Sequence, residues 1–156
     1  MYKQYALSKC GIIIYSYLSV IMKKVDKVFI IDDDSIFLYS LQKLLTNFDF
    51  AKEVKTFVDA EEAIIFFEDH ANQSTLLPDL IFLDIAMPMM SGWEFLDDFE
   101  VLYHQIAKKM DLFVVSSSIS KLDIEKAKSY PVVVDYITKP ITSQVLQQIL
   151  QKQRVA

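Results

Sequence analysis

The stretch VFIIDDDSIF, residues 28–37, carries the pattern from which the fold can be argued. Four apolar residues are followed at once by three aspartates, and a helical pattern begins at Ser35. A continuous apolar run of this kind is expected for a strand that helices cover on both faces. Three carboxylates after such a strand belong either to a solvated helix start or to a cation site. The choice between these depends on what the rest of the chain places beside them.

Four more short runs with strand character follow along the chain. They are EVKTFV (53–58), DLIFLD (79–84), DLFVVS (111–116) and VVVDYI (132–137). The runs at 79–84 and 111–116 have a continuously apolar interior, like the first. The run at 53–58 includes polar side chains, which suits a strand at the edge of a sheet.

Segments with helical periodicity separate these runs. In SIFLYSLQKLLTNF, residues 35–48, apolar residues recur at spacings of three and four, which predicts one buried stripe. Other helix starts are marked by a capping side chain three residues before an acid. These pairs are Asp59 with Glu62, Ser91 with Glu94, and Ser120 with Asp123. A last helix is expected after Pro140.

Five β-α units in a row predict an α/β fold with a doubly wound, five-stranded parallel sheet and right-handed crossovers. Helices on both faces of this sheet make a three-layer sandwich. Ligands in such sheets bind at the carboxyl ends of the strands. The residues at these ends are therefore the first candidates for a functional site.

Charged and hydroxyl side chains follow four of the five predicted strands. They are Asp32, Asp33 and Asp34 after the first, Asp84 after the third, Ser116 at the end of the fourth, and Lys139 after the fifth. Two like charges 4 Å apart repel by about 4 kcal/mol at an effective dielectric constant near 20. Because one lysine cannot neutralise several carboxylates, either some of them are protonated or a divalent cation binds. Oxygen ligands without His or Cys favour Mg²⁺.

From about Lys24 to Arg154 the chain resembles the receiver domain of response regulators in two-component signalling, most closely the stand-alone type typified by the chemotaxis regulators. The resemblance is carried by VFIIDDDS, PDLIFLDIAMPMMSGWEFL, LFVVSSS and DYITKP, in the family's order and spacing. It implies a flavodoxin-like (βα)5 fold with strand order 2-1-3-4-5. The domain is expected over residues 22–156.

The resemblance also implies a role for individual residues. Asp84 matches the aspartate that accepts a phosphoryl group. Asp33 and Asp32 match the acidic pair that binds Mg²⁺, the first directly and the second through water. The backbone carbonyl of Ala86 matches a further metal ligand. Asp34 matches no ligand and is better interpreted as a cap of the first helix.

The remaining family positions are also filled. Ser116 matches the hydroxyl residue and Lys139 the lysine that contact the phosphoryl group, and the bond to Pro140 is often cis in the family. Tyr136 matches an aromatic switch residue. Two positions that are thought to tune hydrolysis of the aspartyl phosphate differ from common family choices, namely Ala86 and Ser118. The resemblance therefore leaves the lifetime of the phosphorylated state open.

The implied function is phosphoryl transfer from a sensor histidine kinase or a histidine phosphotransfer protein. The chain would be a phosphorylation target with self-catalysed transfer and hydrolysis rather than an enzyme acting on other substrates. Phosphorylation would change the face made by the fourth helix, fifth strand and fifth helix of the domain. A downstream protein, or a second copy in a phosphorylation-dependent dimer, would bind this face.

Two alternatives differ in mechanism. A haloacid-dehalogenase-like phosphatase would use Asp32 as its nucleophile and Asp34 as the second carboxylate, but the chain lacks a cap insertion and the final acidic pair of that class. A pseudo-receiver would bind partners without phosphorylation. The intact set of acceptor residues argues against it.

Composition limits the other function classes. Sixteen basic and twenty-one acidic residues give a net charge of −5, and no basic run could follow a phosphate backbone, so direct nucleic-acid binding is not expected. A single cysteine, Cys10, excludes an intramolecular disulfide and suits a reducing cytoplasm.

The apolar segment at residues 10–22 is too short to span a membrane and has no signal-peptide cleavage site. Met22 is followed by a polar stretch and the first strand. Two interpretations of residues 1–21 stay open, namely a loosely docked or disordered extension, and a mis-assigned start with Met22 as the true first residue.

Overall fold

The five apolar runs form the strands of one parallel sheet in the computed structural model, which describes residues 24–152. The strands are β1 (Val25–Ile31), β2 (Ala51–Phe57), β3 (Leu80–Leu83), β4 (Asp111–Ser116) and β5 (Val133–Thr138). Their order is β2-β1-β3-β4-β5, with every neighbouring pair parallel. The predicted fold class and strand order are thus confirmed, and β2 lies at an edge as its polar residues indicated.

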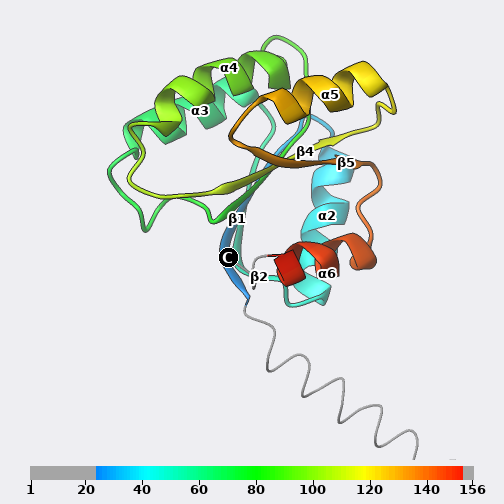
Figure 1. The fold of residues 1–156 in the computed structure, drawn as a ribbon. Helices are drawn as coiled ribbons and strands as arrows, with labels where there is room; N and C mark the ends of the chain where they lie inside the picture. Colours follow the sequence, from blue (N-terminus) through cyan, green and yellow to red (C-terminus); the bar gives the residue numbers. More distant parts are fainter. Residues whose placement is uncertain (1–23, 153–156) are drawn as a thin grey trace, which may run out of the picture.

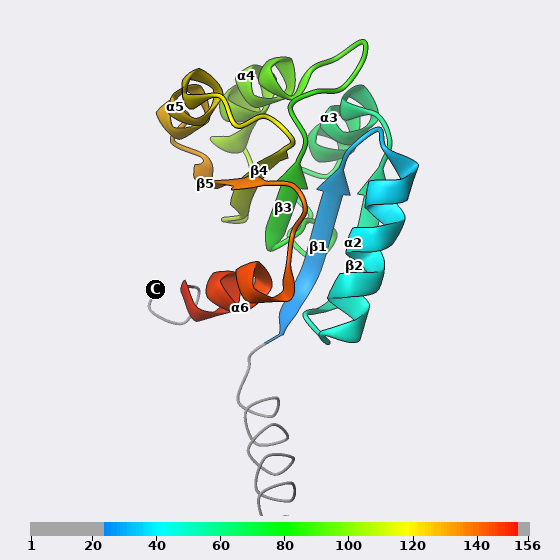
Figure 2. The ribbon, with the colours of Figure 1, turned by 90° about the vertical axis from the view of Figure 1, so that its right-hand side faces the viewer.

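Five helices connect and cover the strands. They are α2 (Ser35–Asn47), α3 (Ala60–Asp69), α4 (Gly92–Tyr103), α5 (Lys121–Ser129) and α6 (Ser143–Lys152). Helices α2 and α6 lie on one face of the sheet, and α3, α4 and α5 lie on the other (Figures 1 and 2). Three layers result, as the alternation of runs and helical segments predicts.

Two hydrophobic clusters lie on opposite faces of the sheet. Along β1, Phe29 and Ile31 face the cluster that includes α3 and α4, whereas Val28 and Ile30 face the cluster that includes α2 and α6. All four side chains are fully buried. This alternation explains why a strand that is covered on both faces has no polar position in its interior.

The helix starts follow the capping patterns only in part. Ser91 and Glu94 form the predicted reciprocal capping box of α4, and Asp59 caps α3 through the amide of Glu61. Ser120 makes no side-chain capping bond at the start of α5, so the third predicted box is wrong. The carboxylate of Asp123 instead accepts a hydrogen bond from Ser118, two residues before the cap position.

The predictions on residues 1–21 lie outside the described residues. None of the helices within residues 24–152 has the length and apolar character that a membrane span requires.

Candidate functional site

Asp84 is held at the carboxyl end of the sheet by backbone bonds. It directly follows β3, and its N–H donates to the carbonyl of Ile31 at 2.9 Å. Its side chain is nearly buried, and the Oδ1 atom accepts a hydrogen bond from the Ile85 amide at 2.9 Å. One carboxylate oxygen is thereby engaged locally, which leaves Oδ2 as the atom available to a ligand or reactant.

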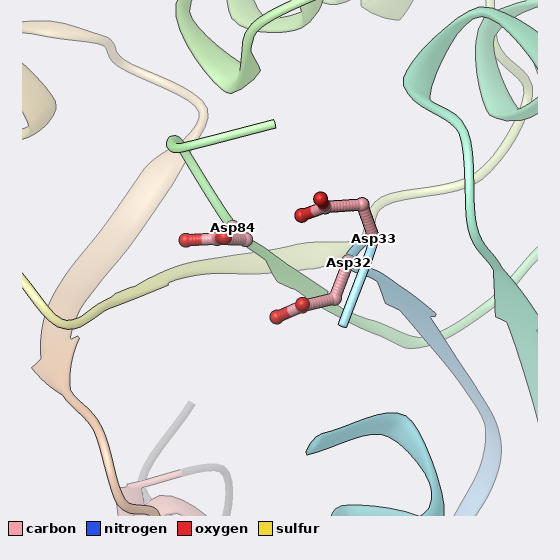
Figure 3. A group of neighbouring side chains, drawn as sticks. All are labelled: Asp32, Asp33 and Asp84. Atoms are coloured by element: carbon pink, nitrogen blue, oxygen red, sulfur yellow. The ribbon is translucent and has the colours of Figure 1, made fainter. Parts of the chain in front are cut away.

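Asp32 and Asp33 follow β1, the strand beside β3. The N–H of Asp32 donates to the Phe57 carbonyl at 3.0 Å, and its side chain is only 1% exposed. Asp33 is exposed. One carboxylate oxygen from each of Asp32, Asp33 and Asp84 lies within 4.8 Å of the others, and Figure 3 shows the three side chains grouped at the ends of the two strands. We call these three residues the acidic cluster.

Lys139 bridges two members of the acidic cluster. Its Nζ lies 2.6 Å from Oδ2 of Asp32 and 3.5 Å from Oδ2 of Asp84. The same ammonium lies 4.1 Å from the centre of the Phe37 ring, which adds a cation-π contact. The backbone N–H of Lys139 donates to the Ser116 carbonyl at 2.8 Å, so the ends of β4 and β5 fix its position. The peptide bond to Pro140 is cis, as the resemblance suggested.

The electrostatics of the acidic cluster favour a bound cation. Burial raises the pKa of Asp32 above its usual value, and the charge of Asp84 adds to this effect, although Lys139 and the Asp34 amide act in the opposite direction. The contacts with Lys139 and the Asp34 amide therefore do not fully offset the cost of burying this carboxylate. The donor atoms are all carboxylate oxygens, the type preferred by Mg²⁺. The residues present thus fit a magnesium ion, and Asp32, Asp33 and Asp84 are the side chains that would hold it.

Ser116 is the last residue of β4, the strand next to β3, and Tyr136 lies on β5, the strand next to β4. Ser116 is 1% exposed, and its hydroxyl oxygen accepts a hydrogen bond from the Ser118 amide at 3.1 Å. Tyr136 is half-buried, and its hydroxyl donates to the Ser118 carbonyl at 2.8 Å. The two residues predicted to respond to phosphorylation therefore share Ser118 as a hydrogen-bond partner.

The other predicted residues separate into two groups. Asp34 caps α2, because its carboxylate accepts from the amides of Ile36 and Phe37, and this confirms its interpretation as a cap. Ala86 is exposed two residues after Asp84. Its role as a carbonyl ligand stays a prediction, as do the ligand and catalytic roles of the acidic cluster, Ser116 and Lys139.

Two contacts of the site were not predicted. Phe37 lies beneath Lys139, and its place in the apolar stripe of α2 gave no hint of this contact. A Cβ atom on Gly92 would lie 2.2 Å from the Asp84 carbonyl oxygen and 2.6 Å from the Ile85 Cα. Glycine is often found where the backbone must approach another group closely. The glycine directly after the Ser91 cap could therefore have indicated this contact from the sequence.

Comparison with known proteins defines the class. The family model of the response regulator receiver domain matches residues 28–151. This chain belongs to that family of two-component signalling proteins.

Individual relatives agree with this assignment. An uncharacterized response regulatory protein of Staphylococcus epidermidis is 31% identical over 125 residues, which cover 80% of this chain and 45% of the relative. Hybrid signal transduction histidine kinase I of Dictyostelium discoideum is 28% identical over 127 residues, 81% of this chain and 7% of the kinase. The chain therefore spans less than half of these curated relatives.

Solved structures show the same architecture. The two component response regulator from Cytophaga hutchinsonii superposes with a TM-score of 0.78 at 27% identity, covering 86% of this chain and all of that one. The phosphorylated cyanobacterial phytochrome response regulator RcpA gives a TM-score of 0.65 at 30% identity, covering 83% of this chain and 91% of that one. Both matches extend over nearly the whole described domain.

Proposed function

We propose that the protein is a phosphoacceptor response regulator in which Asp84 receives a phosphoryl group from a phosphohistidine in a Mg²⁺-dependent reaction. The donor would be a sensor histidine kinase or a histidine phosphotransfer protein. The observation that carries this proposal is the acidic cluster bridged by Lys139 at the carboxyl edge of the sheet. The phosphorylated state of the similar protein RcpA supports it.

The chemistry follows from the arrangement of the side chains. The Oδ2 atom of Asp84 attacks the phosphorus, the P–N bond to the donor histidine breaks, and its electron pair stays on the imidazole nitrogen. Charge spreads over the three remaining phosphoryl oxygens in the transition state. A magnesium ion bound at the acidic cluster would supply positive charge to these oxygens. Lys139 would contact one of these oxygens, and the Ser116 hydroxyl would donate to another.

The product is a mixed anhydride on Asp84 that water hydrolyses. The chain is thus a phosphorylation target that catalyses its own modification, not an enzyme acting on a separate substrate. New contacts of Ser116 and Lys139 with the phosphoryl group would disturb the bond from Tyr136 to Ser118. This disturbance would alter the face formed by α5, β5 and α6 and its affinity for a downstream protein or a second copy.

Phosphorylation of Asp84 can be tested with a small-molecule donor. The protein is incubated with Mg²⁺ and acetyl phosphate, and hydroxylamine-labile phosphoryl groups are mapped by mass spectrometry. We expect labelling of Asp84 in the wild type and none in Asp84→Asn. Asp34→Asn is the matched control, because Asn also caps helices well and Asp34 lies outside the acidic cluster.

Other outcomes would favour the alternatives. Labelling at Asp32 would support the phosphatase mechanism. Absence of labelling in the wild type, with donors and Mg²⁺ at saturating concentration, would support a phosphorylation-independent receiver.

A further inference from the structure

The loop between β4 and α5 is organised around one residue, Ser118. Its backbone N–H donates to the Ser116 hydroxyl oxygen at 3.1 Å, and its carbonyl accepts from the Tyr136 hydroxyl at 2.8 Å. Its own hydroxyl donates to Oδ2 of Asp123 at 2.5 Å and accepts from the Ser120 amide at 3.2 Å. Ser118 therefore connects Ser116, Tyr136 and the first turn of α5.

Asp123 is the charged member of this arrangement. It is the third residue of α5, a position from which an acid usually reaches back to the cap residue. Here Ser120 makes no capping bond, and the carboxylate reaches past it to Ser118. A hydrogen bond from a hydroxyl to a carboxylate is charge-assisted and stronger than one between neutral groups.

Packing alone holds this end of α5 weakly. Of the described residues of α5, Ala127 alone is buried, and it lies in the second half of the helix. Ile119 and Leu122, which flank the helix start, are 81% and 76% exposed. The bond between Ser118 and Asp123 is thus a main restraint on the relative position of the loop and the first turn of α5.

We propose that Asp123 is a positioning residue for phosphoryl binding. Its carboxylate fixes Ser118, and Ser118 in turn fixes the Ser116 hydroxyl through its amide and the Tyr136 ring through its carbonyl. With its oxygen held by the Ser118 amide, the Ser116 hydroxyl keeps its hydrogen free to donate to a phosphoryl oxygen on Asp84. This role rests on the proposed function of Asp84.

A simpler role for Asp123 must give different results. An acid in the first turn of a helix also stabilises the helix dipole without touching the loop. In that case Asp123 and Ser118 would act independently, and loss of the charge alone in Asp123→Asn would have the full effect of Asp123→Ala. Glu125, an exposed acid of the same helix, is the charge-matched control.

The first experiment does not depend on phosphorylation. Amide hydrogen exchange of Ser118 and Ser120 is measured by NMR in the unmodified protein. We expect Asp123→Ala to accelerate exchange at both amides about tenfold, because the loop opens locally more often. Glu125→Ala should leave both rates unchanged, and Asp123→Asn, which keeps an oxygen acceptor, should stay within about threefold of the wild type. Equal rates in Asp123→Ala and the wild type would refute the positioning role.

The second experiment measures affinity for a phosphoryl mimic. Beryllofluoride is titrated in the presence of Mg²⁺ into the wild type, Asp123→Ala, Ser118→Ala and the double variant. We expect each single variant to bind about fivefold more weakly, the loss of roughly one hydrogen bond, and the double variant to bind no more weakly than either single one. A double variant weakened by the product of the two single effects would show independent action and overturn the inference.

The two experiments separate the possible failures. If the wild type does not bind beryllofluoride, the proposed function fails, and the exchange rates still decide whether Asp123 positions the loop. If the wild type binds it and Asp123→Ala binds equally well, the inference alone fails.

Discussion

Asp32 and Asp34 are two positions apart in the chain and have different tasks. Asp32 is buried and paired with Lys139, whereas Asp34 is exposed and caps α2. The difference arises where β1 ends, because Asp32 still makes a sheet-like bond to Phe57 while Asp34 already accepts the bonds of the first helical turn. Neighbouring carboxylates can thus be separated into cluster and cap from where the strand ends and the helix begins.

Loss of the Asp33 carboxylate from the acidic cluster should remove the stabilisation of the protein by magnesium. We expect Mg²⁺ to raise the melting temperature of the wild type, because a ligand that binds only the folded state adds about 2.7 kcal/mol at one hundred times its Kd. In Asp33→Asn the shift should be largely abolished, while the metal-free variant should melt higher because a repulsive charge is gone. Differential scanning calorimetry with and without Mg²⁺ measures both effects.

Asp34→Asn provides the comparison for this substitution. It removes the same charge one residue away and should keep the Mg²⁺-dependent shift. A shift that persists in Asp33→Asn would remove this residue from the proposed metal site.

Gly92→Ala should destabilise the protein, although alanine is normally the better helix former. The added Cβ would collide with backbone atoms of Asp84 and Ile85, which cannot move aside as a flexible side chain does. We expect a loss of about 1–3 kcal/mol in the free energy of unfolding, measured by denaturant titration. Asp98→Ala at an exposed position of the same helix should change it by less than about 0.5 kcal/mol. A Gly92→Ala variant as stable as the wild type would contradict the close approach.

At the scale of elements, α4 and α5 are joined by an aromatic contact. Trp93 of α4 stacks on Tyr130 with ring centres 6.3 Å apart, and Lys126 of α5 lies 4.3 Å from the Trp93 ring. The Tyr130 hydroxyl donates to Asp97 of α4 at 2.7 Å. The last turn of α5 is therefore held to α4, while its first turn is held to the β4–α5 loop by Asp123.

The hydroxyl of Tyr130 should lose its proton at an unusually high pH. Burial raises its pKa to about 12, with additional contributions from Asp97 and Glu100. We expect Asp97→Asn to lower this pKa toward 10, because the carboxylate acceptor and its charge are lost while burial remains. The absorbance of tyrosinate, taken as the difference between each protein and its Tyr130→Phe derivative, measures the shift. An unchanged pKa in Asp97→Asn would show that burial alone sets it.

The same shift predicts how stability depends on pH. A group with a folded-state pKa above its unfolded value binds its proton more tightly in the folded protein. The contribution of Tyr130 is therefore fully present below pH 10 and is lost as the pH rises to about 12. Over this range the stability of Tyr130→Phe should fall less steeply than that of the wild type.

The helix starts show how far local patterns can predict an element. The pair Ser91 and Glu94 forms its reciprocal box at the first turn of α4, as the spacing predicts. The pair Ser120 and Asp123 has the same spacing, but Ser118 competes for the carboxylate. That competition depends on the path of the β4–α5 loop, and the spacing of two residues in the sequence gives no information about this path.

At the scale of the whole molecule, the strands, their order and the convergence of Asp84, Asp32 and Lys139 could be predicted from the sequence. Parallel strands have their carboxyl ends at one edge, so a list of strand-end residues already approximates the site. The network at Ser118 and the contact of Phe37 could not be predicted. They depend on side-chain orientations and loop paths, which are set only when the layers pack.

The described domain should fold without residues 1–21. Among the residues that the structure describes, the two hydrophobic clusters already draw on all five strands and all five helices. We expect a chain that begins at Met22 to differ from the full chain by less than about 1 kcal/mol in the free energy of unfolding, within the range of changes that leave a core intact. Urea titration of both chains measures this difference. A larger loss would show that the segment contributes to the fold.

The path of the chain through the sheet has a practical consequence. Strand β1 begins and α6 ends toward the end of the molecule opposite the edge that carries the acidic cluster (Figures 1 and 2). A tether attached before β1 or after α6 therefore starts away from Asp84. We therefore expect a fusion partner or surface tether joined to either side of residues 24–152 to leave the acidic cluster open to solution.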